Sequence, residues 1–213
     1  MAGWRVEDGT NLGYNASWRH DSTKGALADM TCAEADELST FHRTFDLFYP
    51  AIRLVYERVF RNRWFDRVTP IANIPEEIWI GGAPTYDRDY AFLLDNGISA
   101  VMNIRAERAD DTALYDAHGV THVRYCVPDI EAPPEDVLSD GVAWIHSQVK
   151  AGRSVLVHCA KGRGRSAAML AAYLMRYHAM TFDEAEDLLR ARRRLVKLED
   201  RHRAVLEAWA GAT

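Results

Sequence analysis

Cys159 lies in the stretch of sequence with the clearest chemical potential. It follows the apolar residues 155–157 and precedes a glycine-containing loop that runs into an amphipathic helix. The backbone N–H groups of such a loop turn inward, and the N-terminus of the following helix points at the same place, so the loop can bind an anion. The positive potential favours the thiolate and lowers its pKa below the usual value of about 8.5. A buried structural cysteine beside a tight turn is the alternative interpretation.

The residues around Cys159 favour the chemical interpretation. Arg165 follows six positions later, and its planar guanidinium can bind two oxygens of one phosphoryl group, which lysine cannot do. Ser166 can donate a hydrogen bond to the sulfur, and His158 is expected to order the loop by hydrogen bonds that favour the thiolate. Glycines permit turns that a side chain would resist. The predicted phosphate-binding residues are Ala160, Lys161, Gly162, Arg163, Gly164 and Arg165.

The elements that must position this loop alternate along the chain from about residue 64. Strands are expected at residues 78–80, 98–104, 123–127 and 154–158, and helices at 86–96, 111–118, 134–150, 166–178, 182–192 and 201–209. Short apolar strands that alternate with helices are typical of an α/β fold whose mostly parallel sheet is covered on both faces. Cys159 then lies directly after the most apolar strand.

Composition divides the chain into three parts. Residues 1–40 are polar and aperiodic and are expected to form a poorly ordered or loosely docked tail. Residues 41–63 carry apolar side chains at three- and four-residue steps, which predicts an amphipathic helix that Pro50 kinks or interrupts. Arginines, Arg53 among them, surround that apolar stripe, so the helix either packs on the main domain or lies on an anionic membrane. Residues 64–213 form the expected catalytic domain.

The overall composition argues against several classes of protein. A formal net charge of −5 gives no indication of nucleic-acid binding. No apolar run reaches the ~18 residues that a membrane span needs, and neither a secretory signal nor a transit peptide is evident. The three cysteines do not suggest a disulfide framework, and Cys126 is expected to be a buried strand residue. We therefore expect a cytoplasmic enzyme that can be peripheral to a membrane.

The loop as a whole resembles the active-site loop of the protein tyrosine phosphatase superfamily, with His158 and Cys159 followed by five residues and then Arg165 and Ser166. The short domain with helices after the loop resembles the dual-specificity branch. Trp64-Phe65-Asp66-Arg67 and the run Ile78-Trp79-Ile80-Gly81-Gly82-Ala83-Pro84 are similar to the opening of the mitochondrial-type phosphatidylglycerophosphate phosphatases.

The resemblance covers about residues 64–210. It implies hydrolysis of phosphate monoesters through a cysteinyl-phosphate intermediate, with neither a metal nor another cofactor. The turn at residues 198–200 reads Leu-Glu-Asp where related phosphatases often have Arg-Pro or Pro-Asn, which weakens the transfer of detailed substrate contacts.

Asp129 is the predicted general acid. It follows an expected strand in a proline-rich loop and stands thirty positions before Cys159, as in the dual-specificity pattern. One carboxylic acid can protonate the leaving oxygen and then activate water in the second step. Asp129 could instead be a turn or cap residue, and Glu131 and Asp136 are rival acids. A dipole role in the first turn of a helix explains Asp136 more simply.

The basic residues bear on the substrate. Lys161 and Arg163 are either ordinary solvated charges or part of a pocket for a substrate with a second negative group. A second basic run is either a solvated helix face or a flank of the pocket, and it comprises Arg190, Arg192, Arg193, Arg194 and Lys197. We favour a phospholipid or phosphoinositide phosphate as substrate, with a phosphoprotein as the alternative. Two other classes of protein fit less well. A phosphate-binding adaptor without catalysis would not need the cysteine, arginine, serine and acid that are all present. A sulfur transferase or arsenate reductase would have its cysteine loop near the N-terminus, with any acid after it.

Overall fold

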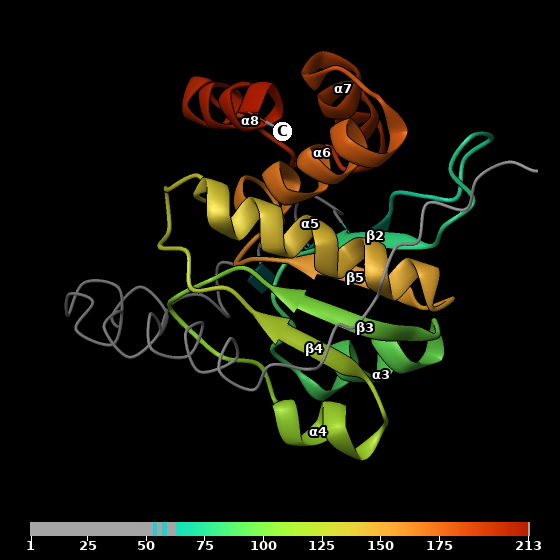
Figure 1. The fold of residues 1–213 in the computed structure, drawn as a ribbon. Helices are drawn as coiled ribbons and strands as arrows, with labels where there is room; N and C mark the ends of the chain where they lie inside the picture. Colours follow the sequence, from blue (N-terminus) through green and yellow to red (C-terminus); the bar gives the residue numbers. More distant parts are fainter. Residues whose placement is uncertain (1–52, 55–56, 59–62, 213) are drawn as a thin grey trace, which may run out of the picture.

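The computed structural model describes residues 53–54, 57–58 and 63–212. The predicted tail 1–40 and most of the predicted helix 41–63 lie outside the described residues. The centre of the fold is a five-stranded sheet in the order β1-β2-β5-β3-β4 (Figure 1). All neighbouring strands are parallel except for the antiparallel edge pair β1 and β2. The strands are β1 (Phe65–Arg67), β2 (Ile78–Gly81), β3 (Ile98–Asn103), β4 (Thr121–Arg124) and β5 (Ser154–His158).

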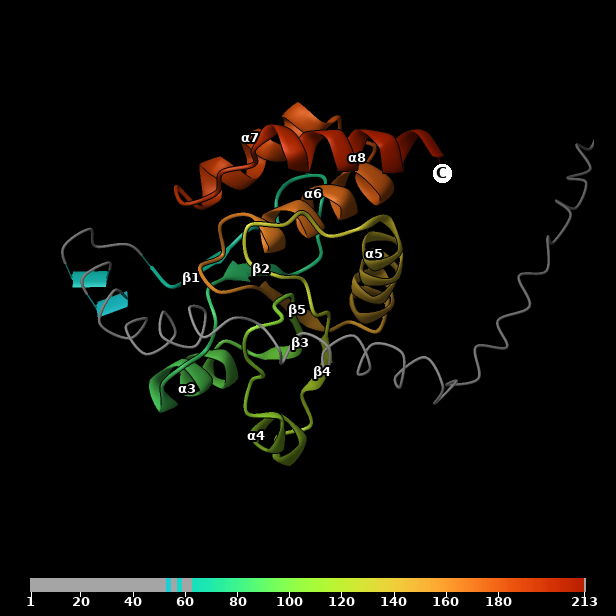
Figure 2. The same ribbon diagram turned by 90° about the vertical axis from the view of Figure 1, so that its left-hand side faces the viewer.

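Helices cover both faces of this sheet, which confirms the predicted α/β fold. In the described part of the chain they are α3 (Asp87–Asp95), α4 (Thr112–Ala117), α5 (Glu135–Lys150), α6 (Arg165–His178), α7 (Phe182–Arg192) and α8 (Asp200–Ala212). α3 and α4 lie on one face, while α5 and α6 lie on the other, with α7 and α8 packed outside α6 (Figures 1 and 2). None of the described helices is long and apolar enough to cross a bilayer.

The central strand β5 holds the two halves of the core together. All five of its residues are buried. Val155 and Val157 belong to the apolar cluster under α5 and α6, whereas Leu156 belongs to the cluster on the α3 side. A strand that is apolar on both faces is expected in the middle of a parallel sheet. This rigid strand ends immediately before Cys159.

The expectations for the segment after residue 120 need correction. β4 spans Thr121–Arg124 rather than 123–127, because the chain turns sharply afterwards: the N–H of Val127 donates to the carbonyl oxygen of Tyr125. Cys126 therefore follows the strand, where it is half-buried and disulfide-bonded rather than a buried, unpaired strand cysteine. Apolar alternation continues through the turn, which explains why the sequence pattern places the end of the strand too far along the chain.

Arg53 is one of the arginines around the predicted apolar stripe of residues 41–63, and the structure describes it. It is buried, and its Nη1 and Nη2 donate to both carboxylate oxygens of Asp89 in α3 at 2.5 and 2.6 Å. Its guanidinium also lies 4.3 Å from the ring centroid of Trp64. Removing one partner of such a buried pair leaves an uncompensated charge and is strongly destabilising. Arg53 therefore packs on the domain.

Candidate active site

The loop at residues 159–164 joins the carboxyl end of β5 to the N-terminus of α6. Its first residue, Cys159, is 3% exposed and carries a free thiol. The loop lines a cavity of about 190 Å³, together with Asp129 and Arg165. The structure thus brings together residues that lie thirty or more positions apart in the sequence.

Cys159 is held in an environment that favours the thiolate. Burial by itself would raise the pKa of the thiol, but the Arg165 charge and hydrogen bonds from Ser166 and from the backbone of Arg163 lower it to about 6. The Ser166 hydroxyl lies 3.4 Å from the Cys159 sulfur. A thiol with such a lowered pKa is mostly ionised at neutral pH and is a strong nucleophile.

This environment predicts the pH dependence of alkylation. Because the thiolate is the reacting form, inactivation by iodoacetate should rise as the pH passes about 6 and level off above it. The measurement is the inactivation rate from pH 4.5 to 9, with mass spectrometry to locate the modified cysteine. A midpoint near the ordinary thiol value of about 8.5 would contradict the predicted environment.

Arg165 is oriented by two carboxylates. Its Nη1 donates to both oxygens of Glu107, at 2.8 and 3.0 Å, and to the carbonyl oxygen of Val127 at 2.7 Å. Its Nη2 donates to Asp129 at 3.0 Å. The guanidinium is therefore fixed beside Cys159 before any phosphate binds. Sequence reasoning missed Glu107, although its position soon after an apolar strand is a weak signal for a site residue.

The two carboxylates differ in their access to the cavity. The Asp129 side chain is 44% exposed and lines the cavity, whereas that of Glu107 is 13% exposed and is occupied by Arg165. Glu131 also lines the cavity, but Asp136 lies in the first turn of α5, where a dipole role suffices. Asp129 and Glu131 therefore both reach the cavity, and of the two Asp129 is the one that contacts Arg165.

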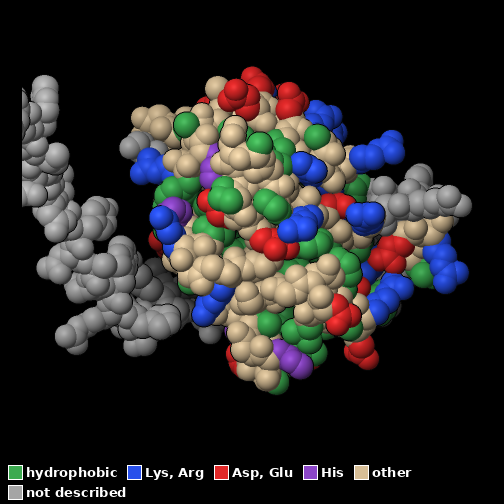
Figure 3. Space-filling model, turned by 90° about the vertical axis from the view of Figure 1, so that its right-hand side faces the viewer, with side chains coloured by type: hydrophobic (Ala, Val, Ile, Leu, Met, Phe, Trp, Pro, Cys, Tyr) green, Lys and Arg blue, Asp and Glu red, His purple; other side chains and the backbone are tan. Residues whose placement is uncertain are grey.

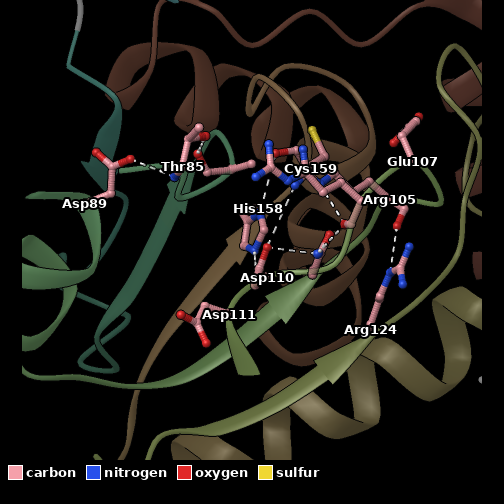
Figure 4. A network of polar contacts seen from close by, with 12 residues as sticks. Thr85, Asp89, Arg105, Glu107, Asp110, Asp111, Arg124, His158 and Cys159 are labelled. Carbon is pink, nitrogen blue, oxygen red and sulfur yellow. Dashed lines mark hydrogen bonds and ion pairs between the residues drawn. The ribbon is translucent and has the colours of Figure 1, made fainter. Parts of the chain in front are cut away.

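His158 is fully buried beneath the loop and contacts Asp110 (Figure 4). Its Nε2 donates to Asp110 at 2.7 Å, and its Nδ1 lies 3.4 Å from the carbonyl oxygen of Cys159. Asn103 and Tyr115 also donate hydrogen bonds to Asp110. Burial would raise the pKa of Asp110, but the charge and hydrogen bond of His158 lower it. Asp110, which sequence reasoning missed, orients His158 beneath Cys159.

Arg193 holds the outside of the loop. It is 1% exposed, and its Nε and Nη2 donate to the carbonyl oxygens of Gly162 and Lys161, each at 2.8 Å. Its Nη1 donates to Asp66 at 2.6 Å. These contacts fix the backbone of the loop at residues 161 and 162. Arg193 is therefore not the solvated charge that one interpretation of the basic run predicted.

Gly162 and Gly164 are needed for close contacts around the loop. Gly162 has φ +65°, and a Cβ added there would lie 2.5 Å from the carbonyl of Gly81. A Cβ on Gly164 would lie 3.2 Å from Nε2 of His202. His202, which the sequence did not single out, is buried and accepts a hydrogen bond at Nδ1 from the N–H of Glu199. The turn between α7 and α8 thus packs along the loop.

Comparison with known proteins places the chain among the phosphatases. A family model described as "Polymorphic toxin system, DSP-PTPase phosphatase" matches residues 80–179. Dual specificity phosphatase 28 of Mus musculus is 32% identical over 127 residues, which are 58% of this chain and 74% of that protein. The chain belongs to the dual-specificity phosphatase family, and it is a phosphoric monoester hydrolase.

Lipid phosphatases are also among its relatives. Phosphatidylglycerophosphate phosphatase PTPMT1 of Arabidopsis thaliana is 31% identical over 173 residues, 76% of this chain. This chain matches 48% of that relative, about half of its length. A crystal structure of PTPMT1 in complex with PI(5)P has a TM-score of 0.63 at 23% identity, and the match covers 70% of this chain and 96% of the other. This structural likeness shows that the chain and PTPMT1 share a fold.

Proposed function

We propose that this protein hydrolyses the phosphate monoester of a phospholipid, with Cys159 as the nucleophile. The observation that carries the proposal is the placement of a cysteine whose pKa is about 6 directly beside Arg165, on the loop that lines the cavity. The partly exposed side chain of Asp129 lines the same cavity. Nucleophile, anion-binding group and acid therefore surround one space of suitable size for a phosphoryl group.

In the first step the Cys159 thiolate attacks phosphorus, and the S–P bond forms as the P–O ester bond breaks. Arg165 and the inward N–H groups of residues 160–165 bind the non-bridging oxygens as their charge redistributes. Asp129, as the general acid of this step, donates a proton to the leaving oxygen. The alcohol departs and cysteinyl phosphate remains.

In the second step water attacks phosphorus, and the S–P bond breaks. Asp129, now a carboxylate, accepts a proton from that water. The Ser166 hydroxyl, 3.4 Å from the sulfur, donates a hydrogen bond that stabilises the departing thiolate. Inorganic phosphate is released and the Cys159 thiolate is restored, so the cycle needs only water as a co-reactant.

Three observations favour a phospholipid phosphate. Lys161, Arg163, Lys197 and Arg201 line the cavity together with Arg165. These cations suit a substrate with a second negative group, such as the phosphodiester of a glycerophospholipid. The named activity of the Arabidopsis relative and the phosphoinositide in the PTPMT1 complex point to the same class. The similarity to dual specificity phosphatase 28 favours a phosphoprotein as the second candidate.

A substrate panel tests this proposal. Relative to p-nitrophenyl phosphate, kcat/KM should be about 10- to 100-fold higher for phosphatidylglycerophosphate or a phosphoinositide than for a phosphotyrosine peptide, since each charge-assisted contact contributes about 1.5–3 kcal/mol. Replacing both Lys161 and Arg163 with alanine should reduce this preference more than it reduces turnover of the aryl phosphate. Phosphopeptides that are hydrolysed better than every lipid would instead establish the protein phosphatase candidate.

A further inference from the structure

Ile130 has a position that the folded domain by itself does not explain. It directly follows Asp129, its φ is +74°, and 68% of the residue is exposed. A β-branched residue at positive φ is a true conformational outlier, and glycine or asparagine would adopt this backbone more readily. Ile130 is thus an apolar residue on a strained backbone, at a position where its side chain gains little burial. Strain of this kind points to a functional role.

The turn that carries Ile130 is well defined. The N–H of Glu131 donates to the carbonyl oxygen of Pro128 at 3.3 Å, which closes a tight turn around Asp129 and Ile130. Pro133, which is buried, and Pro134 follow before α5 begins. Prolines restrict the backbone on both sides. Ile130 therefore projects from a firmly held turn at the edge of the active-site cavity.

The charges around the same cavity are predominantly positive. Beside the proposed catalytic residues it is lined by four cations, Lys161, Arg163, Lys197 and Arg201, and by the carboxylates of Glu131 and Glu199. This local excess contrasts with the net charge of −5 for the whole chain. At the opposite end of the molecule, acidic and basic side chains are interspersed (Figure 3). The electrostatics thus favour an anionic partner at the cavity mouth.

We propose that the mouth of the active-site cavity docks on an anionic bilayer, with Ile130 inserted among the lipid headgroups. An exposed apolar residue at the edge of a cavity lined by more cations than carboxylates is a combination that binds such surfaces, although Ile130 itself is flanked by Asp129 and Glu131. The cavity of about 190 Å³ can hold a phosphorylated headgroup but not the acyl chains of its lipid. Docking at the mouth would let the phosphate enter while the chains stay in the membrane. The inference deepens the proposed lipid phosphatase function, and the entry of a lipid phosphate into the cavity rests on that function.

Sedimentation with vesicles tests the docking directly. The full chain should bind vesicles of phosphatidylcholine and phosphatidylglycerol at low salt, and bind phosphatidylcholine vesicles much less. Ile130→Asn tolerates the positive φ and should weaken that binding about three- to tenfold, as expected for loss of one inserted apolar side chain. Ile130→Trp should bind at least as well, because tryptophan favours the membrane interface. The control Tyr177→Asn, which removes an exposed aromatic residue near the far end of α6, should bind unchanged.

Activity assays separate the docking from the choice of substrate. Ile130→Asn should lower hydrolysis of phosphatidylglycerophosphate in vesicles more than hydrolysis of its short-chain form dispersed as monomers. Equal losses in both assays, or vesicle binding that does not change in Ile130→Asn, would overturn the docking proposal. Loss of phosphopeptide turnover with vesicle binding intact would also overturn it and assign Ile130 to a protein contact. Vesicle binding that depends on Ile130 without hydrolysis of any lipid would support the docking and refute the proposed substrate.

Discussion

Cys159→Ser should reduce phosphate release to background, a loss of about 10⁴-fold or more, the scale seen when an enzyme loses its nucleophile. A serine hydroxyl is not ionised at neutral pH, whereas the Cys159 thiol has a pKa of about 6. The substitution changes one buried atom and leaves the loop N–H groups and Arg165 in place. Binding of inorganic phosphate, measured by calorimetry, should therefore persist.

Arg165→Lys is the companion variant. It keeps the positive charge but loses the planar group that donates to Glu107, Val127 and Asp129. Lysine cannot bind two phosphoryl oxygens in the same geometry, so turnover should also fall severely. Phosphate binding should weaken here, in contrast to Cys159→Ser. Retained turnover in Cys159→Ser would falsify the proposed mechanism.

Asp129→Asn should slow hydrolysis of alkyl phosphates by about 10²–10⁴-fold, the usual contribution of a general acid or base. An alkoxide is a poor leaving group and needs the proton, whereas a p-nitrophenolate leaves readily without it. The expected signature in kcat/KM is therefore a large loss for alkyl phosphates and a much smaller loss for p-nitrophenyl phosphate.

Two matched variants identify the acid. Glu131→Gln removes the neighbouring carboxylate and should have a small effect on both substrates. Glu107→Gln loosens Arg165 and should slow both substrates to a similar extent, because the arginine acts on the phosphoryl group rather than on the leaving group. If Asp129→Asn slows both substrates equally, or if Glu131→Gln shows the stronger dependence on the leaving group, Asp129 is not the acid.

Much of this protein follows from local patterns in its sequence. The strand at residues 154–158 and the helix at 182–192 occur as predicted, since their apolar spacing and end signals lie within the segments themselves. The same holds for the loop that begins at Cys159, because strand, glycines and helix are consecutive. Three-residue β1 was not predicted, as it is too short to show periodicity and depends on its pairing with β2.

The partners of the loop could not be read from the sequence. Glu107 and Arg165 lie 58 positions apart, and Asp110 and His158 lie 48 apart. No periodicity identifies which carboxylate reaches which cation, because each contact depends on how the strands align at the carboxyl edge of the sheet. Arg53 and Arg193 show the same limit, since both resemble surface charges until the fold buries them against specific acceptors. The sequence by itself predicted the loop and its proposed nucleophile, and only the tertiary structure decided which buried charges hold that loop in place.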